Sequence, residues 1–211
     1  MSTKRELAQQ LGVVVGFDDP EASLEQYRTP PSVAAHLVHL ADLNGDIAGG
    51  TVVDLGCGTG MLALGAALRG PATVLGVDVD PAPLSTARAN QNRVGTRTRI
   101  SWLRADATEL PVCPSEPVTA IMNPPFGAQS DNEHADRAFL ATAADIASVS
   151  YSIHNAGSVD FVEAFAADNG GEVTAAYGTT LSLPRQFSFH EAESREIDVE
   201  LFRIEWRRGP Q

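Results

Sequence analysis

The stretch VVDLGCGTG at residues 52–60 decides the fold, because an apolar strand runs there into three glycines at alternate positions. Glycine is needed where the backbone turns tightly and where a ligand approaches the main chain. A dinucleotide-binding turn has similar spacing, but it requires Gly or Ala at the position that Met61 occupies here. The stretch therefore predicts a strand, a ligand-binding turn and a helix, without the full dinucleotide pattern.

Short apolar runs alternate with helical patterns on both sides of this turn, which is typical of a doubly wound parallel α/β sheet with right-handed crossovers. After residue 170 the pattern changes to strands alone, which predicts an antiparallel hairpin at one side of the sheet. In the last strand the apolar phase slips by one residue at Phe202, which predicts either a β-bulge or burial on both faces. The expected helices are 2–11, one opened by Pro30-Pro31 and closed by Asn44-Gly45, 60–69, one that begins at Pro81, 136–147 and 158–168. The expected strands are 51–55, 73–77, 100–103, 118–122, 148–153, one or two over 172–183, then 187–189 and 197–206.

The composition is acidic and poor in lysine. The 211 residues carry 27 Asp and Glu against 15 Lys and Arg, a net charge of −12, and Lys4 is the one lysine. This balance argues against a protein held to nucleic acid or to a membrane surface mainly by charge. In a molar-salt cytoplasm such a surface keeps a protein hydrated, so we expect a halophilic source.

The two cysteines, Cys57 and Cys113, show neither disulfide nor metal-ligand spacing, and no metal site is expected. The first residues lack the apolar core of a signal peptide, and no apolar run reaches 18 residues. We therefore expect a cytoplasmic protein without a membrane association.

Carboxylates lie at or just after the ends of three of the expected strands. Asp54 precedes the first glycine, Asp78 ends the second strand, and Asp106 follows the third. A carboxylate at the end of the second strand can bind both ribose hydroxyls, and one after the third can receive an adenine amino group. Fixed carboxylates suit a sulfonium, and no pyrophosphate site is present, so the pattern predicts S-adenosylmethionine, with S-adenosylhomocysteine as product. The alternative is that these aspartates only cap helices.

The tetrad Asn123-Pro124-Pro125-Phe126 ends the fourth strand. In a planar conjugated amine the nitrogen lone pair is delocalised into the ring, so the amine is a poor nucleophile. The Asn123 side-chain oxygen and the Pro124 carbonyl can accept its two hydrogens, the prolines make that turn rigid, and Phe126 can stack on the ring. The alternative is an ordinary Pro-Pro turn beside a core Phe.

These motifs resemble the methyltransferase-like protein 5 family, whose members place N6-methyladenosine in small-subunit ribosomal RNA. The resemblance implies a Rossmann-like class I S-adenosylmethionine-dependent methyltransferase with a mostly parallel seven-stranded sheet, in an archaeal member. It also implies one structural domain, in which an N-terminal helical extension at 1–50 packs on the cofactor site of a methyltransferase domain at 51–211. The segments that carry it are 24–30, 54–58, 76–80, 121–127, 151–154 and Phe189-His190 before 197–204.

The resemblance also implies the roles of individual residues. The catalytic set is Asn123, Pro124, Pro125 and Phe126. The sequence departs from the family pattern in two ways. Thr59 stands where some relatives have Cys. Lysines that relatives carry are replaced at 128–131 and 191–193, which weakens RNA binding through charge. The implied cofactor-binding residues are Gln26, Tyr27, Thr29, Asp54, Gly56, Cys57, Gly58, Thr59, Met61, Asp78, Val79, Asp106, Ala107 and Asn123.

Other functions stay open at this point: a glutamine-N5 methyltransferase of a release factor, a guanine-N2 RNA methyltransferase, or a non-catalytic ribosome-assembly factor. The third strand is expected at the sheet edge, and the family implies a small zinc-containing activator subunit there, near Trp102. The alternative is that Trp102 packs under a helix. The arginines near this edge and near the C-terminus, Arg203 among them, are either phosphate contacts or a solvated surface.

Overall fold

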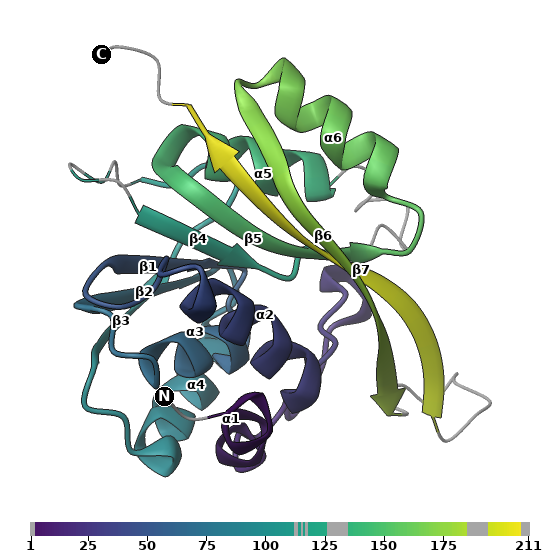
Figure 1. Ribbon diagram of the computed structural model, residues 1–211. Coiled ribbons are helices and arrows are strands. Elements are labelled where there is room, and N and C mark those ends of the chain that lie inside the picture. The colour runs from purple at the N-terminus through teal and green to yellow at the C-terminus, as the bar shows by residue number, and fades with distance from the viewer. Residues whose placement is uncertain are drawn as a thin grey trace.

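The computed structural model describes residues 3–111, 114, 116, 118–125, 135–184 and 194–207, without the side chains of 181–184, 194 and 195. Helices and strands alternate along most of the chain, as the sequence predicts (Figure 1). The helices are α1 Lys4–Leu11, α2 Pro31–Leu43, α3 Met61–Ala67, α4 Pro81–Val94, α5 Ala135–Ile146 and α6 Val159–Asp168, with a short 3-10 helix at Ala22–Leu24. The strands are β1 Thr51–Leu55, β2 Thr73–Asp78, β3 Arg99–Arg104, β4 Val118–Met122, β5 Ala147–Asn155, β6 Gly171–Pro184 and β7 Ser194–Trp206.

The seven strands form one sheet in the order β3-β2-β1-β4-β5-β7-β6. The first five are parallel, while β7 pairs antiparallel with both β5 and β6. The register lines up Leu103, Val77, Leu55 and Met122 across four neighbouring strands. The segments that follow these four residues therefore leave the sheet side by side, at its carboxyl edge.

Helices cover both faces of the sheet: α1 to α4 lie on one face, and α5 and α6 on the other (Figure 1). Each face has its own apolar core. Buried residues of α1, α2 and α3 pack on the first face, and those of α5 and α6 pack on the second. None of the described helices has the length and apolar character needed to cross a membrane.

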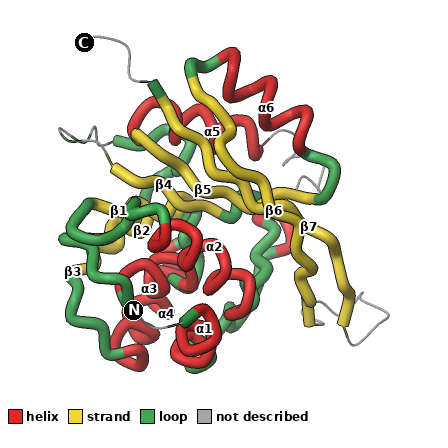
Figure 2. Tube along the Cα trace, in the orientation of Figure 1, coloured by secondary structure: helices red, strands yellow, loops and turns green. Residues whose placement is uncertain are grey.

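The last strand, β7, is buried against both cores. Val199 and Leu201 join the core on the side of α2, whereas Phe202, Ile204 and Trp206 join the core beside α5. The pairing of β5 with β7 is regular, and the register shift lies in β6 between Val173 and Ala175. Burial on both faces is thus the correct alternative for the phase slip, and a bulge in this strand is wrong. Figure 2 shows β6 and β7 continuing as a two-stranded ribbon beyond the rest of the sheet.

A partly buried polar cluster joins the loop after α2 to the strands β5 and β7. The Tyr151 hydroxyl donates to Asp46 Oδ2, and Arg203 Nε donates to the same oxygen at 2.9 Å. Burial, together with the Asp46 carboxylate, raises the pKa of Tyr151, so this hydroxyl stays a donor. Arg203 also pairs with Glu205. The interpretation of Arg203 as an RNA phosphate contact is therefore wrong, because its guanidinium is already bound by carboxylates.

The strand β3 forms one edge of the sheet, as predicted. Trp102 nevertheless packs under α4: its Nε1 donates to Gln91 Oε1 at 2.9 Å. Its ring lies against Gly76 on the neighbouring strand, where a Cβ would come within 2.5 Å of the ring. Of the two alternatives for this side chain, packing under a helix is the one observed.

The contact between Gly76 and Trp102 makes a direct test of this packing. Substitution Gly76→Ala should lower the free energy of unfolding by about 1–3 kcal/mol, because the added methyl group overlaps a ring that has little room to move. Gly178→Ala is the matched control, since nothing lies within 4 Å of a Cβ at that strand position. Urea denaturation should place the control within about 0.5 kcal/mol of the natural protein. Equal stabilities of the two variants would contradict the packing.

Candidate functional site

A cavity of about 400 Å³ lies at the carboxyl ends of β1 to β4. Of the residues implied by sequence, the cavity brings together every cofactor-binding residue, together with Pro124 and Pro125. Phe126 and the segments 128–131, 187–190 and 191–193 lie outside the described residues. The lining comprises Phe17, Leu24, Glu25, Gln26, Tyr27, Arg28, Thr29, Asp54, Gly56, Cys57, Gly58, Thr59, Met61, Leu62, Asp78, Val79, Asp106, Ala107, Thr108, Asn123, Pro124, Pro125, Ala135 and Phe139.

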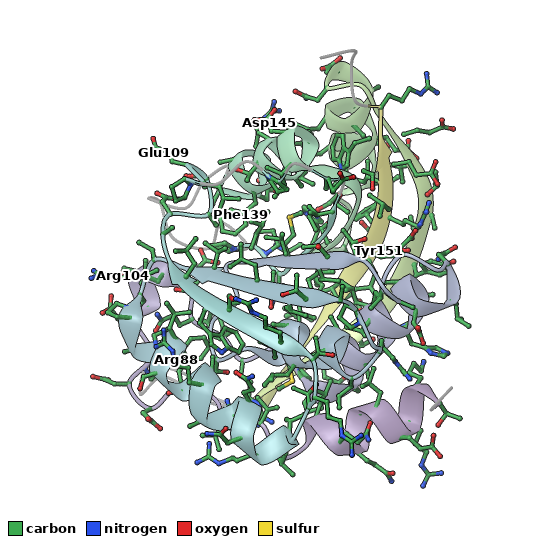
Figure 3. The ribbon with its side chains drawn as sticks, turned by 90° about the vertical axis from the view of Figure 1, so that its left-hand side faces the viewer. Arg88, Arg104, Glu109, Phe139, Asp145 and Tyr151 are labelled. Carbon is green, nitrogen blue, oxygen red and sulfur yellow. The ribbon has the colours of Figure 1, made fainter. Side chains whose placement is uncertain are left out.

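The glycine turn after β1 forms the floor of the cavity. Gly56 and Gly58 have φ angles of 68° and 51°, which side chains rarely tolerate. Neighbouring rings leave no space either: a Cβ would lie 2.9 Å from Phe139 at Gly56 and 2.9 Å from Phe17 at Gly58. The glycines are therefore required both by backbone conformation and by close packing. The ring of Phe139 lies above the sheet in Figure 3.

Asp54 is buried beneath this turn, with 1% of its surface exposed. Its Oδ2 accepts a hydrogen bond of 2.8 Å from the Ala63 amide in the first turn of α3, and its Oδ1 is buried without a partner among the described residues. Burial raises the pKa of Asp54 to about 8, and the nearby charge of Asp78 adds to the effect. The helix-cap alternative is thus correct for one oxygen, while the other remains free to bind.

Asp78 fixes the position of the turn from the end of β2. Its Oδ2 accepts from the Gly58 amide at 2.7 Å, and its Oδ1 accepts from the Asp80 amide at 3.0 Å. Each carboxylate oxygen has a second lone pair that a ligand hydroxyl can use. Burial raises the pKa of Asp78. Asp106, in contrast, is held by Thr108 at the open side of the cavity.

Asn123 has a single, fixed orientation at the end of β4. Its Nδ2 donates to Thr29 Oγ1 at 3.0 Å. Its Oδ1 is buried and has no hydrogen-bond partner in the described part of the chain. An unpaired buried carbonyl oxygen is costly, so this atom is a strong acceptor for a donor that enters the cavity.

The segment before α2 closes over the cavity through contacts between residues distant in sequence. Asn90 on α4 exchanges two hydrogen bonds of 2.9 Å with the backbone of Val15, and Gln26 donates to Asp80 at 2.7 Å. Gln26 also accepts from the Glu21 amide at 2.8 Å, so it holds the segment as well as lining the cavity. Sequence reasoning missed Phe17, Asn90 and Arg28, because isolated residues in irregular segments leave no periodic signal.

The charges of the cavity fit S-adenosylmethionine. Carboxyl groups at the ends of β1 and β2 and after β3 suit a ligand with a sulfonium, an ammonium group and a ribose diol. The buried Oδ1 atoms of Asp54 and Asn123 are acceptors still without donors. A dinucleotide would instead bring two phosphates among Asp54, Asp78 and Asp106, which is unfavourable.

Known proteins have the same fold and sequence pattern. Residues 52–148 match the family model described as a methyltransferase domain. The rRNA N(6)-adenosine-methyltransferase Mettl5 of Drosophila melanogaster is 32% identical over 205 residues, which cover 95% of this chain and 95% of that protein. The chain belongs to the methyltransferase-like protein 5 family.

Archaeal proteins are also similar to this family member. MJ0284 of Methanocaldococcus jannaschii is 34% identical over 97% of this chain and 95% of that protein. The crystal structure of PH1948 from Pyrococcus horikoshii superposes with a TM-score of 0.86 at 39% identity, and covers 98% of both chains. This methyltransferase-like protein 5 member is therefore an S-adenosylmethionine-dependent methyltransferase with the class I Rossmann-like fold, as the sequence predicted.

The buried Asp54 predicts a pH dependence of stability. Folding raises the pKa of Asp54 from 3.8 to about 8. The contribution of Asp54 to the free energy of unfolding is therefore highest below pH 3.8 and is lost as the pH rises to about 8. Asp54→Asn keeps an oxygen for the Ala63 amide but cannot ionise. Its melting temperature without ligand should exceed that of the natural protein at pH 8, by about 2–4 °C for each kcal/mol relieved.

The measurement is a series of thermal melts between pH 5 and pH 9. The difference between Asp54→Asn and the natural protein should widen as the pH rises. Asp145→Asn, at an exposed position on α5 (Figure 3), is the control and should show no such trend. A difference that stays constant over this range would show that Asp54 is ionised throughout.

Proposed function

We propose that the protein transfers a methyl group from S-adenosylmethionine to the N6 amino group of an adenine in RNA, and that this RNA is small-subunit ribosomal RNA. The observation that carries the proposal is the buried, unpaired Oδ1 of Asn123 in the cavity. The Mettl5 proteins of Drosophila melanogaster and Danio rerio, both 32% identical to this chain, are named as methyltransferases of adenosine N6 in rRNA, which supports the substrate.

The proposed cofactor contacts are the lining residues implied by the sequence. Asp78 offers its remaining lone pairs to the ribose hydroxyls, Asp106 accepts from the adenine amino group, and Asp54 lies beside the cationic end. When bound, S-adenosylmethionine supplies an electrophilic methyl group on a positively charged sulfur. In this proposal residues 1–50 are an extension that covers the cofactor, and residues 51–211 are the methyltransferase domain. The other contacts are Gln26, Tyr27, Thr29, Gly56, Cys57, Gly58, Thr59, Met61, Val79, Ala107 and Asn123.

The target amine is activated by acceptors and not by an ionised base. Asn123 Oδ1 and the Pro124 carbonyl accept its two hydrogens, which concentrates electron density on nitrogen. Thr29 holds the Asn123 amide with its oxygen free, so little reorganisation is needed when the substrate enters. Phe126 is proposed to stack on the base and to align the amine for methyl transfer.

The direct test is to map labelled methyl groups on small-subunit ribosomal RNA by mass spectrometry after incubation with labelled S-adenosylmethionine. The proposal expects label on one adenine at N6. Label at guanine N2 would indicate the guanine-N2 RNA methyltransferase, and methylglutamine in a release factor would indicate the glutamine-N5 enzyme. Binding of cofactor with no transfer to any of these would indicate an assembly factor.

Substitution Asn123→Ala removes the proposed acceptor. We expect methyl transfer to fall by about 100-fold or more, because one preorganised acceptor in such a site contributes about 10²–10³. The dissociation constant for S-adenosylhomocysteine, measured by calorimetry, should stay within a few-fold. Asn92→Ala, an exposed position on α4, is the matched control. Unchanged turnover in Asn123→Ala would overturn the mechanism.

We also propose that a small zinc-containing activator subunit adds to the free edge of β3. The support is the family resemblance together with the apolar character of this edge, where Ile100 and Trp102 are only partly buried. Because Trp102 already packs under α4, the added contact is expected to come mainly from the exposed strand backbone. Co-expression with candidate zinc proteins tests this: unchanged solubility and activity would refute an obligate partner.

The acidic composition bears on the RNA and on the cell. Binding through many phosphate contacts loses about 10³–10⁵ in affinity between 50 and 200 mM salt, so basic patches contribute little in molar salt. We propose a cytoplasmic enzyme of a halophilic cell that recognises RNA by shape, stacking and a partner. Its stability and activity should then be higher in molar KCl than in dilute buffer.

A further inference from the structure

Arg28 is the only cationic residue among the described residues that line the cavity. The other charged lining residues are acidic: Glu25, Asp54, Asp78 and Asp106. Its Nε is buried and has no hydrogen-bond partner among the described residues. The stem of the side chain packs against Gly16, where a Cβ would lie 3.1 Å from Arg28 Cδ. A guanidinium in such a place has donors that no protein acceptor uses.

The neighbours of Arg28 place it at one end of the cavity. The next residue, Thr29, bonds to Asn123 at the end of β4. Gly16, which touches its stem, precedes Phe17, and the ring of Phe17 lies on Gly58 in the turn after β1. Asp106 follows β3, two strands away from β1 in the sheet. These contacts place Arg28 in the part of the lining near the turn after β1 and the end of β4, whereas Asp106, the position proposed for the adenine, follows β3.

We infer that Arg28 binds the α-carboxylate of S-adenosylmethionine and thereby selects a cofactor with an intact amino-acid group. This carboxylate is the only anion of the ligand, and Arg28 is the only cation among the described residues that line an otherwise acidic cavity. Burial lowers the pKa of Arg28, so an anion that replaces the lost water is favourable. The inference rests on the proposed position of the cofactor and is independent of the RNA substrate.

The test compares S-adenosylmethionine with decarboxylated S-adenosylmethionine, which lacks only the carboxylate. Dissociation constants of both ligands are measured by calorimetry for the natural protein, Arg28→Met and Arg88→Met. Met keeps an apolar stem against Gly16 but has no charge. Arg88 is exposed on α4, on the other side of the sheet from Phe139 (Figure 3), so it serves as the charge-matched control.

We expect the natural protein and Arg88→Met to bind S-adenosylmethionine about 10- to 100-fold more tightly than the decarboxylated ligand, as one charge-assisted contact allows. In Arg28→Met the ratio should shrink to about threefold or less, mainly through weaker binding of S-adenosylmethionine. Arg28→Gln should show the same narrowed ratio and takes the place of Arg28→Met if thermal melts show that variant unfolded.

Three results would overturn the inference. Dissociation constants of both ligands in Arg28→Met equal to those of the natural protein mean that Arg28 does not bind the carboxylate. Equal weakening of both ligands means that Arg28 only shapes the cavity. A change confined to the KM for RNA means that it contacts the substrate. If the natural protein prefers S-adenosylmethionine to the decarboxylated ligand but methylates no RNA, only the proposed substrate is refuted. If it binds neither ligand, the proposed function and the role of Arg28 are both refuted.

Discussion

The parallel register of β2, β1 and β4 is the constraint on which the site depends. Leu55 pairs with Val77 on one side and with Met122 on the other, so the residues after them leave the sheet at one level. That level brings the glycine turn beside Asp78 and Asn123. A slip of one residue in either pairing would turn the buried side chains of the strand to the opposite face. The two apolar cores fix the register, and the register in turn fixes the chemistry.

The register alone leaves the cavity open, and the segment before α2 closes it. Polar contacts hold that segment, among them those of Asn90 with Val15, Gln26 with Asp80, and Thr29 with Asn123. The last of these has two effects, because it ties down the segment and also orients the Asn123 amide. One hydrogen bond therefore links the position of the segment to the orientation of the acceptor, which explains why an irregular stretch outside the sheet belongs to the functional site.

Much of this could be predicted from sequence, because period and motif are local signals. The alternation of strands and helices predicted the parallel sheet. The acidic residues at the strand ends predicted that the cavity lies at the carboxyl edge of that sheet. For β7 the sequence left two alternatives open, because a slip in the apolar phase is compatible both with a β-bulge and with burial of the strand against two cores. The contacts of Asp46 with Tyr151 and with Arg203 join residues 105 and 157 positions apart and have no sequence period. They follow only from the assembled fold.

The charge of the chain has different meanings at the surface and in the cavity. At the surface, the excess of acids acts through solvent and salt, whereas the partly buried Arg203 is matched by the carboxylates of Asp46 and Glu205. Inside the cavity, each buried polar group without a partner has its own energetic cost. Among the described residues, Asp54 and Asn123 have buried oxygens and Arg28 has a buried nitrogen for which no hydrogen-bond partner is found. A ligand that carries cationic groups and one carboxylate can bind both the acceptors and the donors of the cavity. A dinucleotide or a purely cationic nucleoside cannot. The cavity therefore discriminates by the arrangement of its charges, which the net charge of −12 does not reveal.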